Sequence, residues 1–440
     1  MSDSALFADK NADRNNEIAG SIREVFSYIA KFKGQLFILK IEDTLLDNPQ
    51  FPVLIRDIVQ LHGVGIKILI VPGTRKSIDR QLAAYELQTS FHEGIRLTSA
   101  ETLPLVEQAS LGAAQRILSY LTANGASGIQ GNWVQARSLG IVGGVDYMRT
   151  GKIERIERNI IEKLLNEGFI PILPPIGWNK LGHAYNISST ELATELCRYL
   201  VVGKLFFIGE EGGVKLVDKG IISALNVNQA QEILAKNTNL PFAQKDYLEN
   251  AIRACRTGAK RVHLLSGLSA GSILQEVFSA RGNGTMVYDN EYWSLREASV
   301  DDIPDMLRIM QNYVEKGFLV SRSQDDIEAK LADFVVYVVD TAIHGCGALH
   351  AFENNVYEIA AIAVGANYRD SGVGEQVVNF LIEKAKKQGA EKLFLLTTQA
   401  SDWFYSFGFK DGSIQDLPPS KREKYNGKRN SKVMVINIKR

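Results

Sequence analysis

The stretch from Ala361 to Gly389 places the end of a short apolar strand, a glycine-containing loop and an amphipathic helix in direct succession. Ile359 to Val364 is apolar and ends at Gly365, and the loop after it carries the pattern R-x-x-G-x-G. Apolar residues then recur at spacings of three and four, which is typical of a helix with one buried face. The first N–H groups of such a helix point toward the loop with the positive end of the helix dipole. This order of elements predicts an anion site that suits a pyrophosphate.

The pattern alone leaves the ligand open. Strand–loop–helix units are common, so a single glycine-rich loop is a weak signal. The dinucleotide fingerprint G-x-G-x-x-G fits poorly, because Arg369 stands ahead of Gly372 and Gly374 where that fingerprint has a glycine. Motifs elsewhere in the chain are therefore needed to identify the pyrophosphate-containing ligand.

Length and composition narrow the class of protein. A chain of 440 residues exceeds one hydrophobic core, so we expect two or three domains. Lys plus Arg equals Asp plus Glu at 50 each, and this balance argues against nucleic-acid or anionic-membrane partners. No run of about 18 apolar residues predicts a membrane span. Three widely spaced cysteines, Cys197, Cys255 and Cys346, predict neither a disulfide framework nor a metal site, and favour a reducing cytoplasm.

The chain divides into four segments. Residues 1–34 comprise a polar tail and an amphipathic helix from Ile18 to Phe32, which packs either on its own domain or on another subunit. Residues 35–288 alternate apolar strands with helices, residues 289–294 are a linker, and residues 295–440 form a second domain. The expected strands of the first domain are Leu36 to Lys40, Ile66 to Val71, Ile170 to Pro174, Lys204 to Ile208 and Lys260 to Leu265.

Each expected domain has its own fold class. Near-continuous apolar strands that alternate with helices, such as Phe51 to His62 and Ser189 to Leu200, predict an α/β fold: an open, mostly parallel sheet covered on both faces. In the second domain a helix around Asp301 to Lys316 precedes several strands, which predicts an α+β fold. Its expected strands are Trp293 to Glu297, Phe334 to Asp340, Gly345 to Phe352, Val356 to Val364 and Lys392 to Thr397.

The first domain resembles the amino-acid kinase family, and acetylglutamate kinase within it. The resemblance rests on four stretches: GIRLTSAETL (from Gly94), FIPILPPIG (from Phe169), YNISSTELAT (from Tyr185) and ACRTGAKRVHLLSG (from Ala254). It implies a three-layer sandwich, but the phosphate-binding glycines are missing. Glu42 and Asp43 follow Lys40 where the kinases have a Gly-Gly turn, and two carboxylates repel a phosphate. Thr190 stands where the kinases have their organising acid, so we expect no kinase activity.

A domain that keeps its fold without its phosphate loops is a candidate regulator. Leu264 to Thr285 resembles the arginine-binding part of arginine-inhibited relatives, with Glu276 at the position of the carboxylate that holds the guanidinium. Gly282 and Gly284 match the flanking turn, whereas Arg281 replaces a usual Asp. The resemblance implies allosteric L-arginine at Glu276. The alternative is that Glu276 is a solvated helix residue.

The second domain resembles the GCN5-related N-acetyltransferases, and the bacterial N-acetylglutamate synthases among them. The motifs, in order, are LVSRSQDDIE (from Leu319), EIAAIAV (from Glu358), YRDSGVG (from Tyr368), KLFLLTT (from Lys392), WFYSFGF (from Trp403) and YNGKRNSKV (from Tyr425). The resemblance implies that acetyl-CoA, as co-substrate, lies on the loop identified above. The implied cofactor-binding residues are Ile362, Ala363, Val364, Arg369, Asp370, Ser371, Gly372, Val373 and Gly374.

Two residues are candidates for catalysis. Glu358 is a charged residue in an otherwise apolar strand, where desolvation makes a carboxylate a better base near neutrality, and its position matches the general base. Thr397, at the end of the next strand, matches a proton donor or orienting group. Many relatives use a tyrosine instead, but Phe404 takes its place here and Tyr405 is one residue out of register, so we expect Tyr405 not to be the acid.

The expected substrate is L-glutamate, whose two carboxylates require cations in forked geometry. The resemblance implies a pocket formed by Leu319, Arg322, Arg429 and Ser431. The expected activity is acetyl transfer from acetyl-CoA to glutamate, the first step of arginine biosynthesis, in a homo-oligomer regulated by arginine. Two alternatives remain: a bifunctional acetylglutamate synthase/kinase and a non-catalytic amino-acid sensor.

Overall fold

The computed structural model describes residues 22, 25–216, 220–236, 240–279, 282–289, 293–339, 342–365, 372–423, 425 and 429–438. It divides into two compact units, residues 1–290 and 291–440. Three residues of the expected coenzyme loop, Arg369, Asp370 and Ser371, lie outside the described residues. Arg281 and parts of the N-terminal helix and the linker lie outside them as well. The two units are described separately below.

The first unit is built on an eight-stranded sheet. Every neighbouring pair of strands in it is parallel except β17 with β18. All six residues of β1 are buried, as a strand covered on both faces requires. The strands in sheet order are β16 (Ala224–Asn226), β18 (Thr285–Tyr288), β17 (Arg261–Ser266), β13 (Val202–Gly209), β1 (Leu36–Ile41), β2 (Lys67–Pro72), β10 (Ile170–Ile172) and β5 (Gly128–Gln130).

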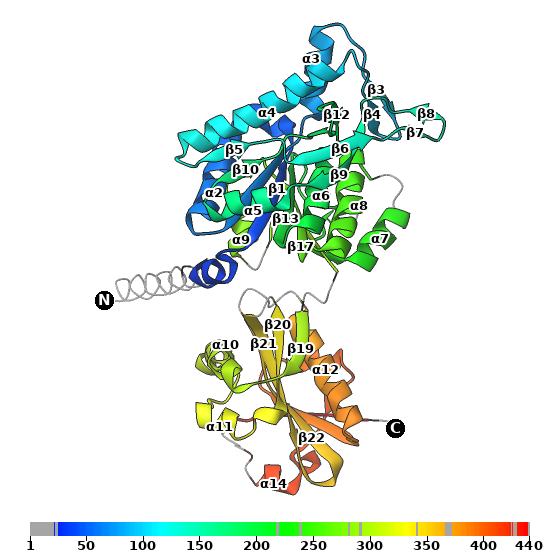
Figure 1. Cartoon of the computed structure of the whole chain (residues 1–440). Helices are drawn as coiled ribbons and strands as arrows, with labels where there is room; N and C mark the ends of the chain where they lie inside the picture. Colours follow the sequence, from blue (N-terminus) through cyan, green and yellow to red (C-terminus); the bar gives the residue numbers. More distant parts are fainter. Residues whose placement is uncertain are drawn as a thin grey trace, which may run out of the picture. The chain divides into compact units, whose positions relative to one another are not determined.

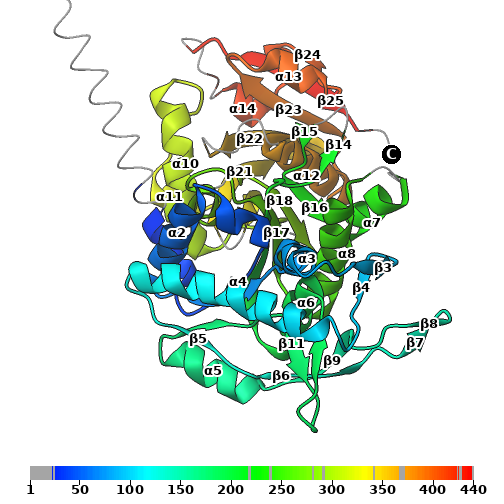
Figure 2. The same ribbon diagram turned by 90° about the horizontal axis from the view of Figure 1, so that it is seen from above.

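Helices cover both faces of this sheet. On one face α2 (Phe51–Gly63), α4 (Leu103–Ala123) and α9 (Ser272–Phe278) bury their apolar sides, and α2 and α4 lie side by side in both views (Figures 1 and 2). The other face is covered by α5 (Arg158–Asn166), α6 (Ser189–Tyr199), α7 (Val227–Lys236) and α8 (Phe242–Thr257). The prediction of an open, mostly parallel three-layer sandwich is confirmed.

Smaller elements surround the main sheet. A second sheet combines β12 (Ala184–Asn186), β11 (Ile176–Trp178), β6 (Val134–Ser138) and β9 (Gly151–Ile156). The short pairs are β3 (Ser90–His92) with β4 (Ile95–Leu97), β7 (Ile141–Val142) with β8 (Val145–Asp146), and β14 (Lys215–Leu216) with β15 (Gly220–Ile221). Helix α3 (Arg75–Ala84) follows β2 directly, so its first turn meets the carboxyl ends of the central strands.

The N-terminal helix packs only in part on its own unit. Residues 25–32 are helical, and Phe32 is buried with its ring centroid 5.6 Å from that of Phe37. Ile22 and Phe26, two residues of the expected apolar face, remain 50% and 66% exposed. The packing of Phe32 therefore explains only one end of the apolar stripe.

The second unit is a seven-stranded sheet, antiparallel except for the pair β22 and β23. The α+β prediction for this part of the chain is confirmed. The strands in sheet order are β19 (Trp293–Glu297), β20 (Phe334–Val339), β21 (Ala342–Ala351), β22 (Val356–Val364), β23 (Lys392–Thr397), β25 (Lys432–Asn437) and β24 (Lys410–Asp411). Its helices are α10 (Ile303–Glu315), α11 (Gln324–Glu328), α12 (Val373–Lys387), α13 (Ser401–Tyr405) and α14 (Pro419–Arg422).

Two glycines on β21 bring the signature helix α12 close to the sheet. A Cβ atom on Gly345 would meet Val373 of α12 at 2.8 Å. A Cβ atom on Gly347 would meet Val377 at 2.8 Å and Leu381 at 3.0 Å, both on the same helix. Helix α10 packs on the opposite face of the sheet. The close approach of α12 sets the position of its N-terminus at the end of β22.

Candidate active site and a second cleft

A wedge opens between β22 and β23. The two parallel strands pair only from Val356 to Glu358, which face Lys392 to Phe394, and then separate. A cavity of about 490 Å³ fills the wedge. Its walls come from the C-terminal halves of both strands, from the first turn of α12 and from α13. A ligand in the wedge would therefore contact the backbone of both strands.

Strand β22 is irregular where it borders the cavity. Its register with β21 shifts between Ala360 and Ala363, and Ala361 adopts a left-handed φ of 55°. A bulge of this kind turns backbone groups away from the regular ladder. At the strand end the N–H of Val364 donates to the hydroxyl of Tyr313 at 3.3 Å, and that hydroxyl donates to the Val364 carbonyl at 2.9 Å. Among the expected oxyanion donors, Val364 is therefore already engaged by α10.

The described part of the glycine loop leads directly into α12. Gly372 is the residue before the helix and has a φ of 77°, a conformation that favours glycine. A Cβ atom on Gly374 would meet the Trp403 ring at 3.3 Å, so a larger residue there would press on α13. Gly372 and Gly374 both line the cavity, and Val373 is buried beneath them. The N-terminal turn of α12 thus faces the wedge, as the sequence predicts for an anion site.

Glu358 is the last residue of β22 before the strands part. It is only 4% exposed, and its Oε2 accepts a hydrogen bond from Nζ of Lys421 at 2.7 Å. His350 is its cross-strand neighbour on β21 and is itself bonded to Asp333 at 2.6 Å. The carboxylate expected to act as base is therefore buried and ion-paired. Sequence reasoning missed Lys421 because it belongs to a basic run that reads as a solvated tail.

The four residues expected to hold glutamate come from two distant segments. An Nη of Arg429 donates to the carbonyl of Phe318 at 2.7 Å, which brings Arg429 beside the turn that carries Leu319. Arg322 is half-buried. Burial lowers its pKa, while the charge of Glu358 opposes this and the charge of Arg429 adds to it. Ser431 is buried, and its carbonyl accepts from the Tyr425 hydroxyl at 2.7 Å. Phe318 and Leu319 also line the cavity, so the turn that Arg429 contacts borders the wedge.

The candidate proton donors lie at the other wall. Thr397 is buried at the end of β23, lines the cavity, and its Oγ1 accepts from the N–H of Ala400 at 3.0 Å. Phe404 is buried and lines the cavity without a polar atom. The hydroxyl of Tyr405 instead donates to Asp411 at 2.6 Å and accepts from Lys432 at 2.9 Å. Of the three positions considered as proton donors, Thr397 is thus the one that places a hydroxyl-bearing residue on this wall.

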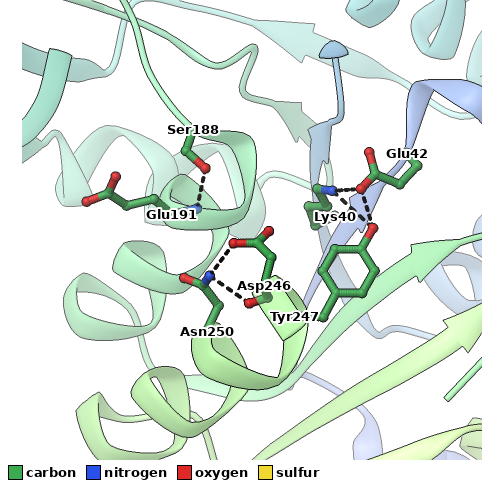
Figure 3. A network of polar contacts seen from close by, with 7 residues as sticks. All are labelled: Lys40, Glu42, Ser188, Glu191, Asp246, Tyr247 and Asn250. Atoms are coloured by element: carbon green, nitrogen blue, oxygen red, sulfur yellow. Dashed lines mark hydrogen bonds and ion pairs between the residues drawn. The ribbon is translucent and has the colours of Figure 1, made fainter. Parts of the chain in front are cut away.

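The first unit retains a cleft at the carboxyl ends of its central strands. Cavities of about 350 Å³ and 580 Å³ both border Glu42, Arg75 and Tyr247. Glu42 accepts hydrogen bonds from the ammonium of Lys40 and from the hydroxyl of Tyr247 (Figure 3). The Lys40 ammonium also donates to that hydroxyl at 3.2 Å. Burial raises the pKa of Glu42, but the charge of Lys40 and the two hydrogen bonds outweigh it and hold that pKa below its usual range. The positive charge of Lys40, the lysine that would face a phosphate, is therefore compensated by the Glu42 carboxylate.

Two further polar groups beside this cleft form hydrogen bonds within the protein. Ser188 caps α6 by accepting from the N–H of Glu191 at 3.2 Å, and Asp246 accepts from Asn250 at 3.0 Å (Figure 3). A Cβ atom on Gly73 would meet the Glu42 carboxylate, so Glu42 fills the space beside the turn after β2. Carboxylates rather than glycines therefore follow Lys40 at this end of β1.

Glu276 is held by several donors. It is 6% exposed, so the alternative of a solvated helix residue is wrong. Its Oε1 accepts from Nδ1 of His263 at 2.6 Å, and its Oε2 accepts from the N–H groups of Asn283 at 2.6 Å and Gly284 at 3.3 Å. A Cβ atom on Gly282 would meet this carboxylate at 2.5 Å. Burial, and after it the charge of Lys204, lowers the pKa of His263 to about 4, so the imidazole is neutral.

Comparison with known proteins shows which class this fold and site define. Residues 35–266 match the amino acid kinase family, and residues 303–409 match the acetyltransferase (GNAT) family. The protein is an acyltransferase. Its acetyltransferase fold follows an amino-acid kinase fold in the sequence. It is 33% identical over 439 residues to the amino-acid acetyltransferase of Escherichia coli (strain K12), covering 97% of this chain and 99% of the relative. The Salmonella typhi amino-acid acetyltransferase matches with the same identity and coverage. The chain belongs to the amino-acid acetyltransferase family.

Two solved structures support the same assignment. N-acetylglutamate synthase from Neisseria gonorrhoeae, complexed with coenzyme A and L-arginine, matches with a TM-score of 0.86 and 27% identity over 96% of this chain and 99% of its own. The same enzyme complexed with coenzyme A and N-acetyl-glutamate matches with a TM-score of 0.62 and 28% identity over the same shares. The resemblance inferred from the motifs is confirmed.

Two absences hold for the described residues. None of their helices is both long and apolar enough to cross a membrane. Nor does this part of the chain contain a group of three or more His, Cys, Asp or Glu side chains that would hold a metal ion.

Proposed function

We propose that the protein transfers the acetyl group of acetyl-CoA to the α-amine of L-glutamate and so forms N-acetyl-L-glutamate, the first step of arginine biosynthesis. One observation carries the proposal: the wedge between β22 and β23 has a buried carboxylate at its base, a helix N-terminus at one side and two arginines nearby. The gonococcal relative was solved with coenzyme A and N-acetyl-glutamate, which are the two products of this reaction.

Each step has a candidate residue. The ammonium of glutamate must lose a proton before its nitrogen attacks, and Glu358 takes that proton through a water molecule. The nitrogen attacks the thioester carbon, and the oxygen gains charge that backbone N–H groups of Ile362 and Ala363 stabilise. The carbon–sulfur bond then breaks, and the coenzyme leaves as a thiolate. As the amide forms, its nitrogen releases a second proton, and Thr397 relays a proton to the thiolate, which becomes the thiol.

Binding of the two substrates divides between the two sides of β22. Acetyl-CoA lies on the α12 side, with its pyrophosphate at the loop from Arg369 to Gly374 and the first helical turn. Glutamate lies toward Leu319, where Arg322 and Arg429 hold its carboxylates and Ser431 completes the pocket. A guanidinium suits this task because its planar fork matches a carboxylate.

The first unit is proposed to be a regulator that binds L-arginine at Glu276, with Gly282 and Gly284 forming the adjoining turn. The carboxylate is already surrounded by donors, and a ligand guanidinium would replace the His263 contact or share it. Support comes from the gonococcal relative, which was solved with L-arginine. We further propose a homo-oligomer, because Ile22 and Phe26 leave an apolar face exposed. A cytoplasmic location agrees with the three free cysteines.

A thiol-release assay with acetyl-CoA and glutamate tests the proposal and separates it from its alternatives. We expect release that depends on glutamate and is abolished in Glu358→Gln. A non-catalytic sensor would bind ligands without releasing thiol. A bifunctional synthase/kinase would also form ADP from ATP and N-acetylglutamate. The pairing of Lys40 with Glu42 argues against that second activity.

A further inference from the structure

The ion pair between Lys421 and Glu358 has no role in the chemistry set out above. We propose that Lys421 is a positioning residue for acetyl transfer: it keeps the Glu358 carboxylate charged and oriented at the base of the wedge. The inference rests on the proposed function in one respect, namely that Glu358 is the base.

Lys421 is held in place from both sides. It belongs to the short helix α14, whose Ser420 donates through its N–H and its hydroxyl to the two carboxylate oxygens of Glu353, at 3.0 and 2.9 Å. On its other side Arg422 donates to the carbonyl of Leu417 at 3.0 Å. Glu353 lies in the turn immediately before β22. The same turn therefore anchors both the strand that carries Glu358 and the helix that carries Lys421.

The burial of the two partners is unequal. The side chain of Glu358 is 6% exposed, and that of Lys421 is 24% exposed. A carboxylate with so little access to water loses much of its hydration, and a partner ammonium at 2.7 Å restores part of that loss. Lys421 keeps some hydration of its own, so the pair mainly benefits the carboxylate.

Other charged groups face the same carboxylate. Arg322 comes from the segment before α11, with Arg429 and Asp326 within reach of its charge. His350 faces Glu358 from β21 but is committed to Asp333. Lys421 and Arg322 are two cations whose charges act on one buried carboxylate, and Arg429 lies within reach of Arg322. If Lys421 is assigned to Glu358, the two arginines remain for the two carboxylates of glutamate.

This assignment has a consequence for catalysis. A base must be unprotonated before it accepts the proton of the substrate ammonium, and a neighbouring positive charge favours that state. Without Lys421, the Glu358 carboxylate would lose its 2.7 Å ion-pair partner, and with it both a charge that favours the ionised form and a contact that fixes its orientation. A purely structural lysine would instead change the rate equally at every pH.

The test compares three variants by thiol release. In Lys421→Met we expect kcat/KM for glutamate to fall at least tenfold near pH 7, with the KM for acetyl-CoA unchanged. The acidic limb of the pH profile should move upward by about one unit or more. Lys421→Arg should restore the limb to its original pH. The control is Lys384→Met, which breaks the partly buried Lys384–Glu297 pair near the C-terminal end of α12 and should leave the limb in place. If the acidic limb of Lys421→Met coincides with that of the unsubstituted protein, the inference is wrong.

A second measurement requires no substrate. Lys421→Met should lower Tm by roughly 5–10 °C, because it strands a buried charge. In the Glu358→Gln background the same substitution should change Tm little, because no charge remains to be stranded. Equal losses in both backgrounds would overturn the pairing. Failure of the proposed function is distinguishable, because it appears as an unsubstituted protein that does not acetylate glutamate.

Discussion

Arg429 donates a hydrogen bond from its guanidinium to the carbonyl oxygen of Phe318 at 2.7 Å, across 111 residues of chain. A second hydrogen bond from the same nitrogen reaches the carbonyl of Gly317 at 3.2 Å. These contacts join the segment after β24 to the turn after α10 and form one wall of the expected glutamate pocket. In the proposed pocket this arginine would therefore contribute to the structure of the wall as well as to its charge.

The first prediction concerns this residue. Arg429→Ala should raise the KM for glutamate at least tenfold, because it removes a carboxylate partner worth about 1.5–3 kcal/mol. The KM for acetyl-CoA should change less than twofold. Arg429→Lys keeps the charge but loses the forked geometry of the guanidinium. Its KM for glutamate should lie between those of the unsubstituted protein and Arg429→Ala. Steady-state kinetics with each substrate varied in turn provides the measurement, and equal changes in both KM values would contradict the pocket assignment.

A second prediction concerns Glu276. Glu276→Gln should abolish the response of acetyl transfer to millimolar L-arginine while the basal rate stays within twofold, because a neutral amide cannot pair with a guanidinium. The control is Glu232→Gln, which removes an exposed carboxylate that is paired with Lys236 on the same helix. Activity and Tm with and without arginine provide the two readouts. An intact arginine response in Glu276→Gln would exclude this site.

The third prediction is a pH dependence of stability at His263. Its folded pKa of about 4 lies below the ordinary value of 6.5, so between these values the unfolded chain binds more protons than the folded one. Stability should therefore fall by about 3 kcal/mol as the pH drops from 6.5 to 4, and this loss should be complete below pH 4. In His263→Gln that part of the pH dependence should disappear. Denaturant unfolding of both proteins across this range gives the comparison.

A fourth prediction concerns the close packing of α12 on the sheet. Gly347→Ala should destabilise the second unit by about 1–3 kcal/mol, because the added methyl meets three apolar side chains in a filled core. Those side chains are Ile362, Val377 and Leu381, at 2.7, 2.8 and 3.0 Å. Among the described residues, the methyl of Gly365→Ala would meet the His344 carbonyl at 3.5 Å, which is an ordinary contact. Thermal unfolding should separate the two variants, and equal Tm values would refute the packing argument.

The expected elements were recovered where apolar periodicity is strong. The expected strand Leu36 to Lys40 forms as Leu36–Ile41, and the expected helix Phe51 to His62 forms as Phe51–Gly63. The expected strand Ile170 to Pro174 is shorter, ending at Ile172. A proline has no N–H to donate to a neighbouring strand, which limits such extensions. Local pattern therefore predicts that an element exists better than it predicts where the element ends.

The sequence by itself determined the two fold classes, the glycine loop before α12 and the loss of phosphate-binding glycines at Lys40, because each depends on residues close together in the chain. Tertiary structure alone decided the polar contacts between residues far apart in the chain. Lys421 reaches Glu358 across 63 residues, and Tyr247 reaches Glu42 across 205. Burial and ion pairing depend on which segments meet in space, and neither quantity is written in the local pattern of residues.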